Sequence, residues 1–260
     1  MPVSLDRTLL AAPPLIVTLA QVRFEERYEN TLPAVATALR EPMAALDLTV
    51  VAQVHQQQIL VTSESDNTPE ASSQRAAAGW QFKSRDDSTV VTVMTDQATL
   101  ETRNYAGWDV FAQTWHAVVA ALQSTIGPQL TTRLGLRYVN RVQPRDVHTA
   151  AEWRDHDLVD PAFLGPAAGS PLSEHITTAE GRATMSFADG VDALVHHGVL
   201  AEGSGQVFVL DIDCFRQVAE AFETTAVAAA MQNLNDHSLE IFQSVIKESL
   251  RKEMLGRNEG

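Results

Sequence analysis

The chain has 260 residues, of which 45% are hydrophobic and 20% are charged, and this predicts a globular protein with one large domain or two small ones. Its 19 Lys and Arg residues against 33 Asp and Glu residues give a formal net charge of −14, with no run of basic residues. Direct binding to nucleic acid or to an anionic membrane is therefore disfavoured, because both require clustered cations.

The N-terminal stretch 9–20 is hydrophobic, but charged residues precede it and Pro13 and Pro14 divide it. It matches neither the layout of a signal peptide nor the roughly 20 apolar residues that a membrane-spanning helix requires. Cys214 is the single cysteine and cannot form an intrachain disulfide. Its apolar neighbours predict a small buried side chain, and together these features predict a cytoplasmic protein.

The first elements follow from the spacing of apolar residues. The β-branched stretch 15–24 predicts a strand. Over 28–39 the apolar residues recur at intervals of three and four, which predicts a helix that Pro42 ends. Two further strands are expected at 48–54 and 58–62.

The polar, aperiodic stretch 63–78 predicts a surface loop. Apolar runs between residues 80 and 105, interrupted by two polar turns, predict three antiparallel strands. An amphipathic pattern over 108–126 predicts a helix that ends at a Gly-Pro pair, and 131–142 predicts another strand.

The second part of the chain repeats this order of several strands followed by one helix. Residues 175–185, 191–200 and 206–215 predict strands, and apolar positions along 225–252 predict one long closing helix. The fold class that follows is α+β, with antiparallel sheets each followed by a helix, because the strict strand–helix alternation of a parallel sheet is missing.

The predicted domain organisation has an N-terminal α+β half at 1–143 and a C-terminal half at 173–260. The Pro- and Gly-rich stretch 144–172 would connect them. Two similarly built domains and one joint domain both remain open.

Common catalytic signatures are missing from the sequence. It contains no glycine-rich phosphate loop, no Gly-x-Ser-x-Gly elbow, no His-Glu-x-x-His pair and no Cys-x-x-Cys pair. No catalytic residue and no cofactor are therefore predicted.

Two pairs of residues are weaker candidates for binding a metal ion. Asp211 and Asp213 lie two apart on a predicted strand, so both carboxylates would share one face and could hold Mg²⁺ or Mn²⁺. The alternative is that they line the solvent side of a core strand. The adjacent His196 and His197 would face opposite sides, which disfavours a shared metal site.

The best candidate binding site is a row of arginines. Arg133, Arg137 and Arg141 share one face of the predicted strand 131–142, and Gly135 between them permits close approach. They could clamp an anionic small molecule or nucleotide through bidentate hydrogen bonds. The alternative is that they pair with carboxylates on neighbouring strands.

Three segments carry a resemblance to a known family: Gly79-Trp80-Gln81-Phe82, Tyr105-Ala106-Gly107-Trp108-Asp109-Val110-Phe111, and Arg133-Leu134-Gly135-Leu136-Arg137-Tyr138-Val139-Asn140-Arg141. They resemble the GWxF, YxGWxxF and RxGxRYxN segments of a sporadically distributed, largely uncharacterised bacterial family. A strand ending in Arg23-Phe24 and a closing helix with Leu234-Asn235 and Phe242 add to the resemblance. It implies no catalytic residues, and its patchy distribution is similar to that of defence or toxin–antitoxin genes.

Three functional hypotheses follow. The leading one is a non-catalytic protein-interaction subunit, antitoxin-like or part of a bacterial defence system, whose acidic surface meets a basic protein partner or a second copy of the chain. The second is a binding protein for an anionic ligand at the arginine row. The third is a metal-dependent enzyme that uses Asp211 and Asp213.

Overall fold

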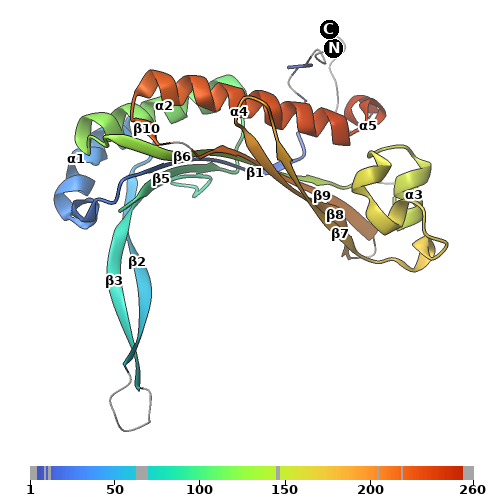
Figure 1. Cartoon of the computed structure of the whole chain (residues 1–260), viewed down its shortest axis with the longest axis horizontal. Coiled ribbons are helices and arrows are strands. Elements are labelled where there is room, and N and C mark those ends of the chain that lie inside the picture. The colour runs from blue at the N-terminus through green and yellow to red at the C-terminus, as the bar shows by residue number, and fades with distance from the viewer. Residues whose placement is uncertain are drawn as a thin grey trace.

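The structure is a computed structural model that describes residues 5–8, 10, 13–62, 70–144, 147–203, 205–217 and 219–253. Its helices lie over one face of an antiparallel sheet (Figure 1). The predicted α+β class and the long C-terminal helix are thereby confirmed. Among the described helices, none combines the length and the apolar character needed to cross a bilayer.

The sheet contains the strands β1 (Leu15–Phe24), β2 (Val50–Thr62), β3 (Glu70–Lys83), β4 (Thr89–Met94), β5 (Gln97–Thr102), β6 (Leu130–Val142), β7 (Ala179–Ser186), β8 (Asp192–Glu202), β9 (Gly205–Arg216) and β10 (Glu220–Ala221). Their order is β2-β3-β4-β5-β1-β6-β9-β8-β7, with β10 also paired to β6. Because β6 pairs with β9, strands from both parts of the chain form one continuous sheet.

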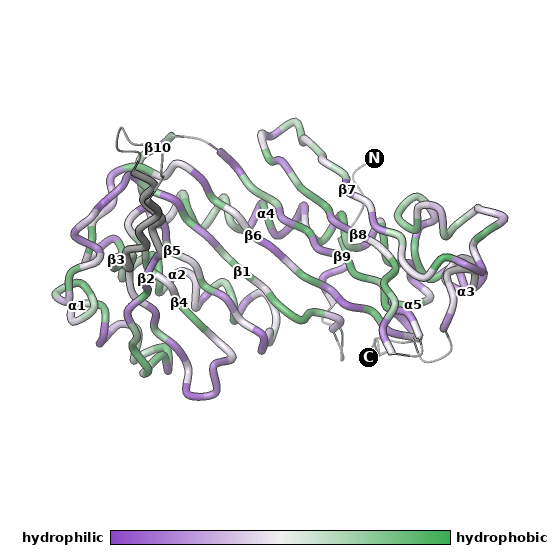
Figure 2. The backbone as a smooth tube through the Cα atoms, turned by 90° about the horizontal axis from the view of Figure 1, so that it is seen from below, coloured by the Kyte–Doolittle hydropathy of each residue, from purple (hydrophilic) through white to green (hydrophobic). Residues whose placement is uncertain are grey.

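The helices are α1 (Pro33–Ala44), α2 (Trp108–Thr125), α3 (Ala150–Asp155), α4 (Thr224–Val245) and α5 (Glu248–Glu253), with 3₁₀ turns at Tyr28–Thr31, Pro161–Phe163, Gly165–Ala168 and Ser173–His175. Helices α1, α2 and α4 lie on the same face of the sheet, and α4 contacts both β6 and β9 (Figure 1). The opposite face of β5, β1 and β6 is open, as the view from that side shows (Figure 2).

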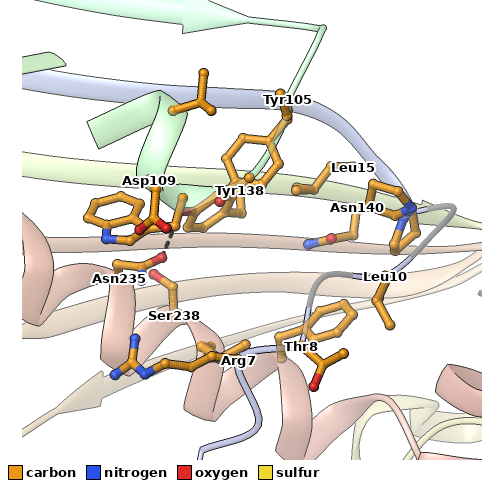
Figure 3. Close-up of a pocket in the computed structure, with 18 of the residues that line it drawn as sticks. Arg7, Thr8, Leu10, Leu15, Tyr105, Asp109, Tyr138, Asn140, Asn235 and Ser238 are labelled. Atoms are coloured by element: carbon orange, nitrogen blue, oxygen red, sulfur yellow. Dashed lines mark hydrogen bonds between the residues drawn. The ribbon is translucent and has the colours of Figure 1, made fainter. Parts of the chain in front are cut away.

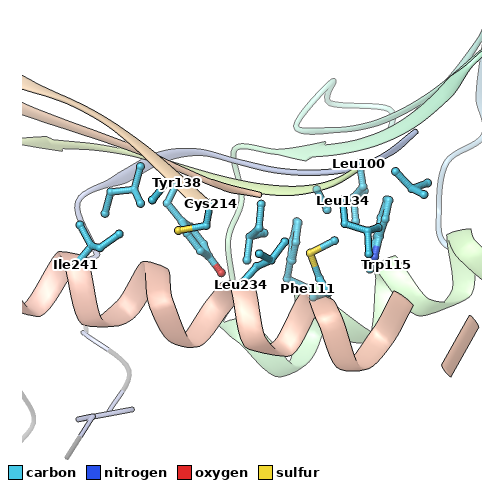
Figure 4. Packing of buried hydrophobic residues seen from close by; sticks show 14 of the residues in the cluster. Leu100, Phe111, Trp115, Leu134, Tyr138, Cys214, Leu234 and Ile241 are labelled. Carbon is cyan, nitrogen blue, oxygen red and sulfur yellow. The ribbon is translucent and has the colours of Figure 1, made fainter. Parts of the chain in front are cut away.

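The core lies between the sheet and the two long helices. Alternate residues of each central strand point to the helices, so that Leu134 and Leu136 of β6 are buried. They belong to the same buried cluster as Trp115 of α2 and as Leu234 and Ile241 of α4 (Figure 4). This burial, at about 1.5–3 kcal/mol for each large apolar side chain, holds the helices on the sheet.

The turn between β7 and β8 is fastened to α4. Asp189 in this turn accepts hydrogen bonds from Nε2 of His237 at 2.9 Å and from Nδ2 of Asn233 at 3.0 Å. The bond from His237, with that from Asn233, lowers the pKa of Asp189 to about 2. The ring of Phe187 lies 4.1 Å from that of His237, so the end of the hairpin adds a contact that fixes α4.

Two predicted helix ends are wrong. Pro42 lies inside α1, and the helix continues to Ala44. So close to the C-terminal end of the helix, the proline removes only one backbone hydrogen bond, which the helix tolerates. The long closing helix stops at Val245, since Ile246 is extended and forms a β-bridge with Val159. The chain resumes as α5, so 225–252 is not one continuous helix.

The predicted loop at 63–78 is wrong from Glu70 onward, where β3 begins, and residues 63–69 lie outside the described residues. Here β3 runs against β2 in a long ribbon, whose register extends from Val50 opposite Lys83 to Thr62 opposite Glu70. Backbone hydrogen bonds along such a ribbon form without apolar alternation, and this is why the pattern of apolar residues missed it.

The outer part of this ribbon is a projecting arm, which we define as His55–Thr62 of β2 and Glu70–Ala77 of β3. Only Gly79–Lys83 of β3 pair with β4, so in the described structure the strands of the arm pair with each other alone. Figure 1 shows the arm extending from the sheet on the side away from the helices.

Gly79 lies at the base of the arm, where the register of β2 and β3 shifts between Val54 and His55. A β-carbon at Gly79 would lie 2.0 Å from the carbonyl oxygen of Val93, which is a severe clash with backbone. Only glycine therefore allows β4 to approach this closely at the bulge.

We expect Gly79→Ala to lower the free energy of unfolding by about 1–3 kcal/mol, because either strand must shift to admit the methyl group. Gly169→Ala is the control, since no atom lies within 4 Å of the added β-carbon there. Urea unfolding measures both variants. Equal stability of the two would contradict the steric account of Gly79.

Candidate functional site

The three candidate arginines lie on the open face of β6, beside acidic residues of the neighbouring strands. Arg137 donates two hydrogen bonds to Asp211 of β9, from Nε at 2.7 Å and from Nη2 at 2.6 Å. This bond with Asp211 raises the pKa of Arg137 further above its ordinary value. Arg141 pairs in the same way with Glu202 of β8.

Arg133 completes the row. Its Nη2 lies 3.2 Å from Oδ2 of Asp213, and its Nη1 donates to Gln21 of β1 at 2.6 Å. Burial raises the pKa of Asp213 despite the nearby guanidinium groups. A β-carbon on Gly135 would lie 2.6 Å from Nη1 of Arg133, so the glycine makes room for this side chain, which lies over the ring of Phe215.

The residues that suggested an anion site and those that suggested a metal site are therefore each other's partners. Asp211 and Asp213 bind Arg137 and Arg133, so an anion or a metal ion at this row would have to displace an existing ion pair. Both kinds of site stay predictions. No group of three or more His, Cys, Asp or Glu suited to a metal ion occurs among the described residues.

The side chains of the adjacent His196 and His197 point to opposite faces of β8, as alternation along a strand requires. Nε2 of His196 is 3.7 Å from Glu180 on β7. Nδ1 of His197 is 2.7 Å from the carbonyl oxygen of Phe163, on the other side of β8.

A pocket of about 680 Å³ lies on the opposite, helix-covered face of the sheet (Figure 3). We call it the Tyr138 pocket, after the residue of β6 that lies at its centre. Its walls come from β1, β6, the start of α2, the middle of α4 and the N-terminal segment. Its apolar lining includes Leu10, Leu15, Trp108, Val110, Leu239 and Phe242.

The N-terminal segment, which contains Asp6 and Arg7, forms one side of the pocket. Polar contacts attach this segment to α4. The backbone N–H of Asp6 donates to Oε1 of Gln243 at 3.2 Å, and Nε2 of Gln243 donates to the carbonyl oxygen of Asp6 at 2.5 Å. Nη2 of Arg7 donates to Asp236 at 2.8 Å. These side chains hold the segment in place over α4.

Asp236 also connects this segment to the wall of the pocket. It accepts a hydrogen bond from Nε2 of Gln232 at 2.8 Å. Oε1 of Gln232 in turn accepts from Nε1 of Trp108 at 2.6 Å. The indole ring at the start of α2 is thereby fixed against α4.

Two tyrosines and an asparagine form a polar chain inside the pocket. The hydroxyl of Tyr138 donates to Oδ1 of Asn235 at 2.8 Å, and the ring of Tyr105 meets that of Tyr138 edge-on at 5.9 Å (Figure 3). Burial raises the pKa of both phenols, that of Tyr138 well above its ordinary value. Both groups are therefore neutral donors and acceptors.

A second amide lies beside this chain. Asn140 follows Tyr138 on the same face of β6, is 3% exposed, and donates from Nδ2 to the carbonyl oxygen of Leu210 at 3.1 Å. Its Oδ1 has no hydrogen-bond partner within the described chain, and neither has Nδ2 of Asn235, which is 7% exposed.

Ser238 is a further polar residue of the lining, but its hydroxyl is already used. It donates to the carbonyl oxygen of Leu234 at 2.8 Å and is 1% exposed. Burial raises the pKa of the nearby Cys214 thiol to about 11, so the single cysteine is a buried neutral side chain, as its sequence context predicted.

Sequence reasoning missed this pocket, although signals for it were present. Tyr138 and Asn140 occupy helix-facing positions of β6 between apolar residues, and Asn235 interrupts the apolar stripe of α4. A polar residue at a core position indicates that a hydrogen-bonding partner is needed there. Tyr105 and Trp108 were named only in a segment that carries the family resemblance, which implies no site residues.

We expect Tyr138→Phe to lower the free energy of unfolding by about 1–3 kcal/mol, because Oδ1 of Asn235 is then buried without a partner. Tyr28→Phe is the matched control, since Tyr28 is 69% exposed, and its effect should be small. Chemical denaturation followed by circular dichroism measures both. Equal unfolding midpoints for the two variants would contradict a structural role for the Tyr138 hydroxyl.

Comparison of the sequence with protein-family models gives no match, and a search of curated proteins gives none either.

Proposed function

We propose that this protein binds a small molecule in the Tyr138 pocket. The observation that carries the proposal is the pair of buried amides, Asn140 and Asn235, each with one polar atom that lacks a partner in the described chain. Neither atom belongs to the fully buried polar atoms that lack a partner, and both residues line the pocket, so a ligand can reach the two atoms from the pocket side. A ligand that forms hydrogen bonds with them replaces water as their partner.

The size and the lining of the pocket support the same proposal. Small-molecule sites are usually mostly apolar clefts of about 300–1,000 Å³ with a few placed polar groups. The volume of about 680 Å³ falls within this range, and apolar and aromatic side chains form most of the wall. The polar groups around Tyr138 are mainly amides and phenols, which suit hydrogen bonding to a ligand, and the carboxylate of Asp109 lies near enough to act on the phenol of Tyr105.

A neutral fluorescent probe tests this function. N-phenyl-1-naphthylamine should bind the full-length protein and fluoresce more strongly there than in water, because the pocket is apolar. Val110→Trp should weaken its binding by about tenfold or more, since Val110 lines the pocket and is 54% exposed, so the larger side chain obstructs the pocket without overfilling the core.

The control is Leu172→Trp, which adds an indole at another exposed apolar residue outside the pocket lining. Its affinity for the probe should remain within about twofold of the wild type. Equal loss in both variants, or no binding to the wild type, would refute binding in the Tyr138 pocket.

A second candidate function is that of a non-catalytic protein-interaction subunit, antitoxin-like or part of a bacterial defence system. The projecting arm favours it, because a two-stranded ribbon alone is only marginally stable in water and its outer strand has an unpaired edge. The net charge of −14 fits a basic partner protein in the cytoplasm, and a second copy of the chain is the alternative partner.

Shortening the arm tests this second function. Replacing residues 57–75 by Asn-Gly should leave the body folded, since the sheet order beyond β3 does not depend on them. A protein that copurifies stoichiometrically when the native neighbouring genes are coexpressed should be lost from this variant and retained by Val110→Trp. No such partner, or one that both variants retain, would contradict interaction through the arm.

A further inference from the structure

We infer that the ligand of the Tyr138 pocket is an organic cation, in which a protonated amine near Asp109 is attached to an apolar ring or chain. This inference rests on the proposed binding function and adds the chemical class of the ligand. Two features of the pocket carry it: the charges of the residues that line it, and the cluster of aromatic rings beside Asp109.

Negative charge exceeds positive charge in the lining. The charged residues there are Asp6, Asp109 and Arg7. Arg7 is the single basic residue in the described part of the lining, and its Nη2 already lies 2.8 Å from Oδ1 of Asp236 on α4. An anionic ligand would therefore be repelled by carboxylates that no free cation balances, whereas a cationic ligand supplies a counter-charge.

The charge of Asp109 acts inside the pocket. Burial raises the pKa of Tyr105, and the nearby carboxylate of Asp109 raises it further. Figure 3 shows the side chain of Asp109 directed toward Tyr138 and Asn235. Within the described chain this carboxylate forms neither an ion pair nor a hydrogen bond, so it can pair with a bound amine without giving up another partner.

Asp109 also lies in the first turn of α2, where a carboxylate stabilises the partial positive charge of the helix N-terminus. That partial charge amounts to about half an elementary charge. A full negative charge on Asp109 therefore exceeds it, and this end of the pocket stays negative. A cation is attracted there even though the helix begins at the pocket wall.

The arginine row does not alter the charge of the pocket. Arg133, Arg137 and Arg141 lie on the open face of the sheet, and each is paired with a carboxylate of a neighbouring strand. The sheet separates them from the helix-covered face. The net charge of −14 on the whole chain also attracts cations from solution.

Aromatic rings form a continuous cluster beside Asp109. The ring centroid of Phe111 lies 6.2 Å from that of Trp108 and 6.0 Å from that of Tyr105, and the rings of Tyr105 and Tyr138 are 5.9 Å apart. Trp108, Tyr105 and Tyr138 line the pocket. Such rings bury the apolar body of a ligand, and the face of a ring also attracts a cation within about 6 Å. The cluster therefore suits an amine with an apolar body.

Three naphthalene compounds of similar size test the inference on the wild-type protein: naphthalen-2-ylmethylamine, naphthalen-2-ylmethanol and 2-naphthoate. At pH 7 the amine is protonated, the alcohol is neutral and the acid is ionised. Each compound competes with N-phenyl-1-naphthylamine. We expect the amine to bind about fivefold more tightly than the alcohol, which is the size of an ion pair near the surface, and 2-naphthoate to bind most weakly.

Asp109→Asn supplies a second measurement, because it removes the charge and keeps the shape of the side chain. The amine should then bind no more tightly than the alcohol, while the affinity of the alcohol stays within about twofold of that for the wild type. Unchanged binding of the alcohol also reports that the pocket still folds.

Glu41→Gln is the matched control, since Glu41 is an exposed acidic residue of α1 outside the pocket lining. This variant loses the same charge and should keep the preference for the amine. An equal loss of the preference in both variants would show an effect of net charge alone and would overturn the role of Asp109.

The remaining outcomes separate this inference from the function on which it rests. If the alcohol or 2-naphthoate binds as tightly as the amine to the wild type, the cationic class is wrong, although the pocket still binds ligands. If Asp109→Asn keeps the full preference, Asp109 is not the counter-charge. If neither N-phenyl-1-naphthylamine nor any of the three compounds binds, the proposed function itself fails.

Discussion

The packing of α2 and α4 on a single face of one antiparallel sheet is the constraint on which the rest of the structure depends. Each central strand sends alternate residues toward the helices, and these must be apolar or paired because they lose contact with water. The same alternation places the remaining residues on the open face. Both candidate sites follow from this division, since the pocket belongs to the helix-covered face and the arginine row to the open one.

The two faces of β6 illustrate how one strand serves two environments. On the open face, Arg133 and Arg137 form ion pairs with carboxylates of β9 that lie diagonally across from them, since the residue directly opposite Arg137 is Asp213, the partner of Arg133. Charges of both signs thereby neutralise each other along the sheet. On the covered face, Tyr138 and Asn140 replace apolar residues and find hydrogen-bond partners on α4 and β9. Polar groups on the covered face are costly unless they are paired, which is why they indicate function more strongly than the exposed arginines do.

Much of the fold was predictable from local pattern. Alternation and turn residues placed β4 and β5 and gave the extent of α2, because these elements bury one face each. The pattern failed where burial does not determine the conformation. The arm is held by backbone pairing, and α4 ends at Val245 because Ile246 pairs with Val159, far away in the sequence.

The candidate site was less predictable than the fold. The sequence by itself determined the α+β class, the acidity and the row of arginines on one strand face, since periodicity and composition are local properties. Only the tertiary structure decided that these arginines have carboxylate partners and that Tyr138, Asn140 and Asn235 meet in one pocket. The physical reason is that strand register and helix packing bring together residues about 100 positions apart, and the spacing along the chain carries no record of such contacts.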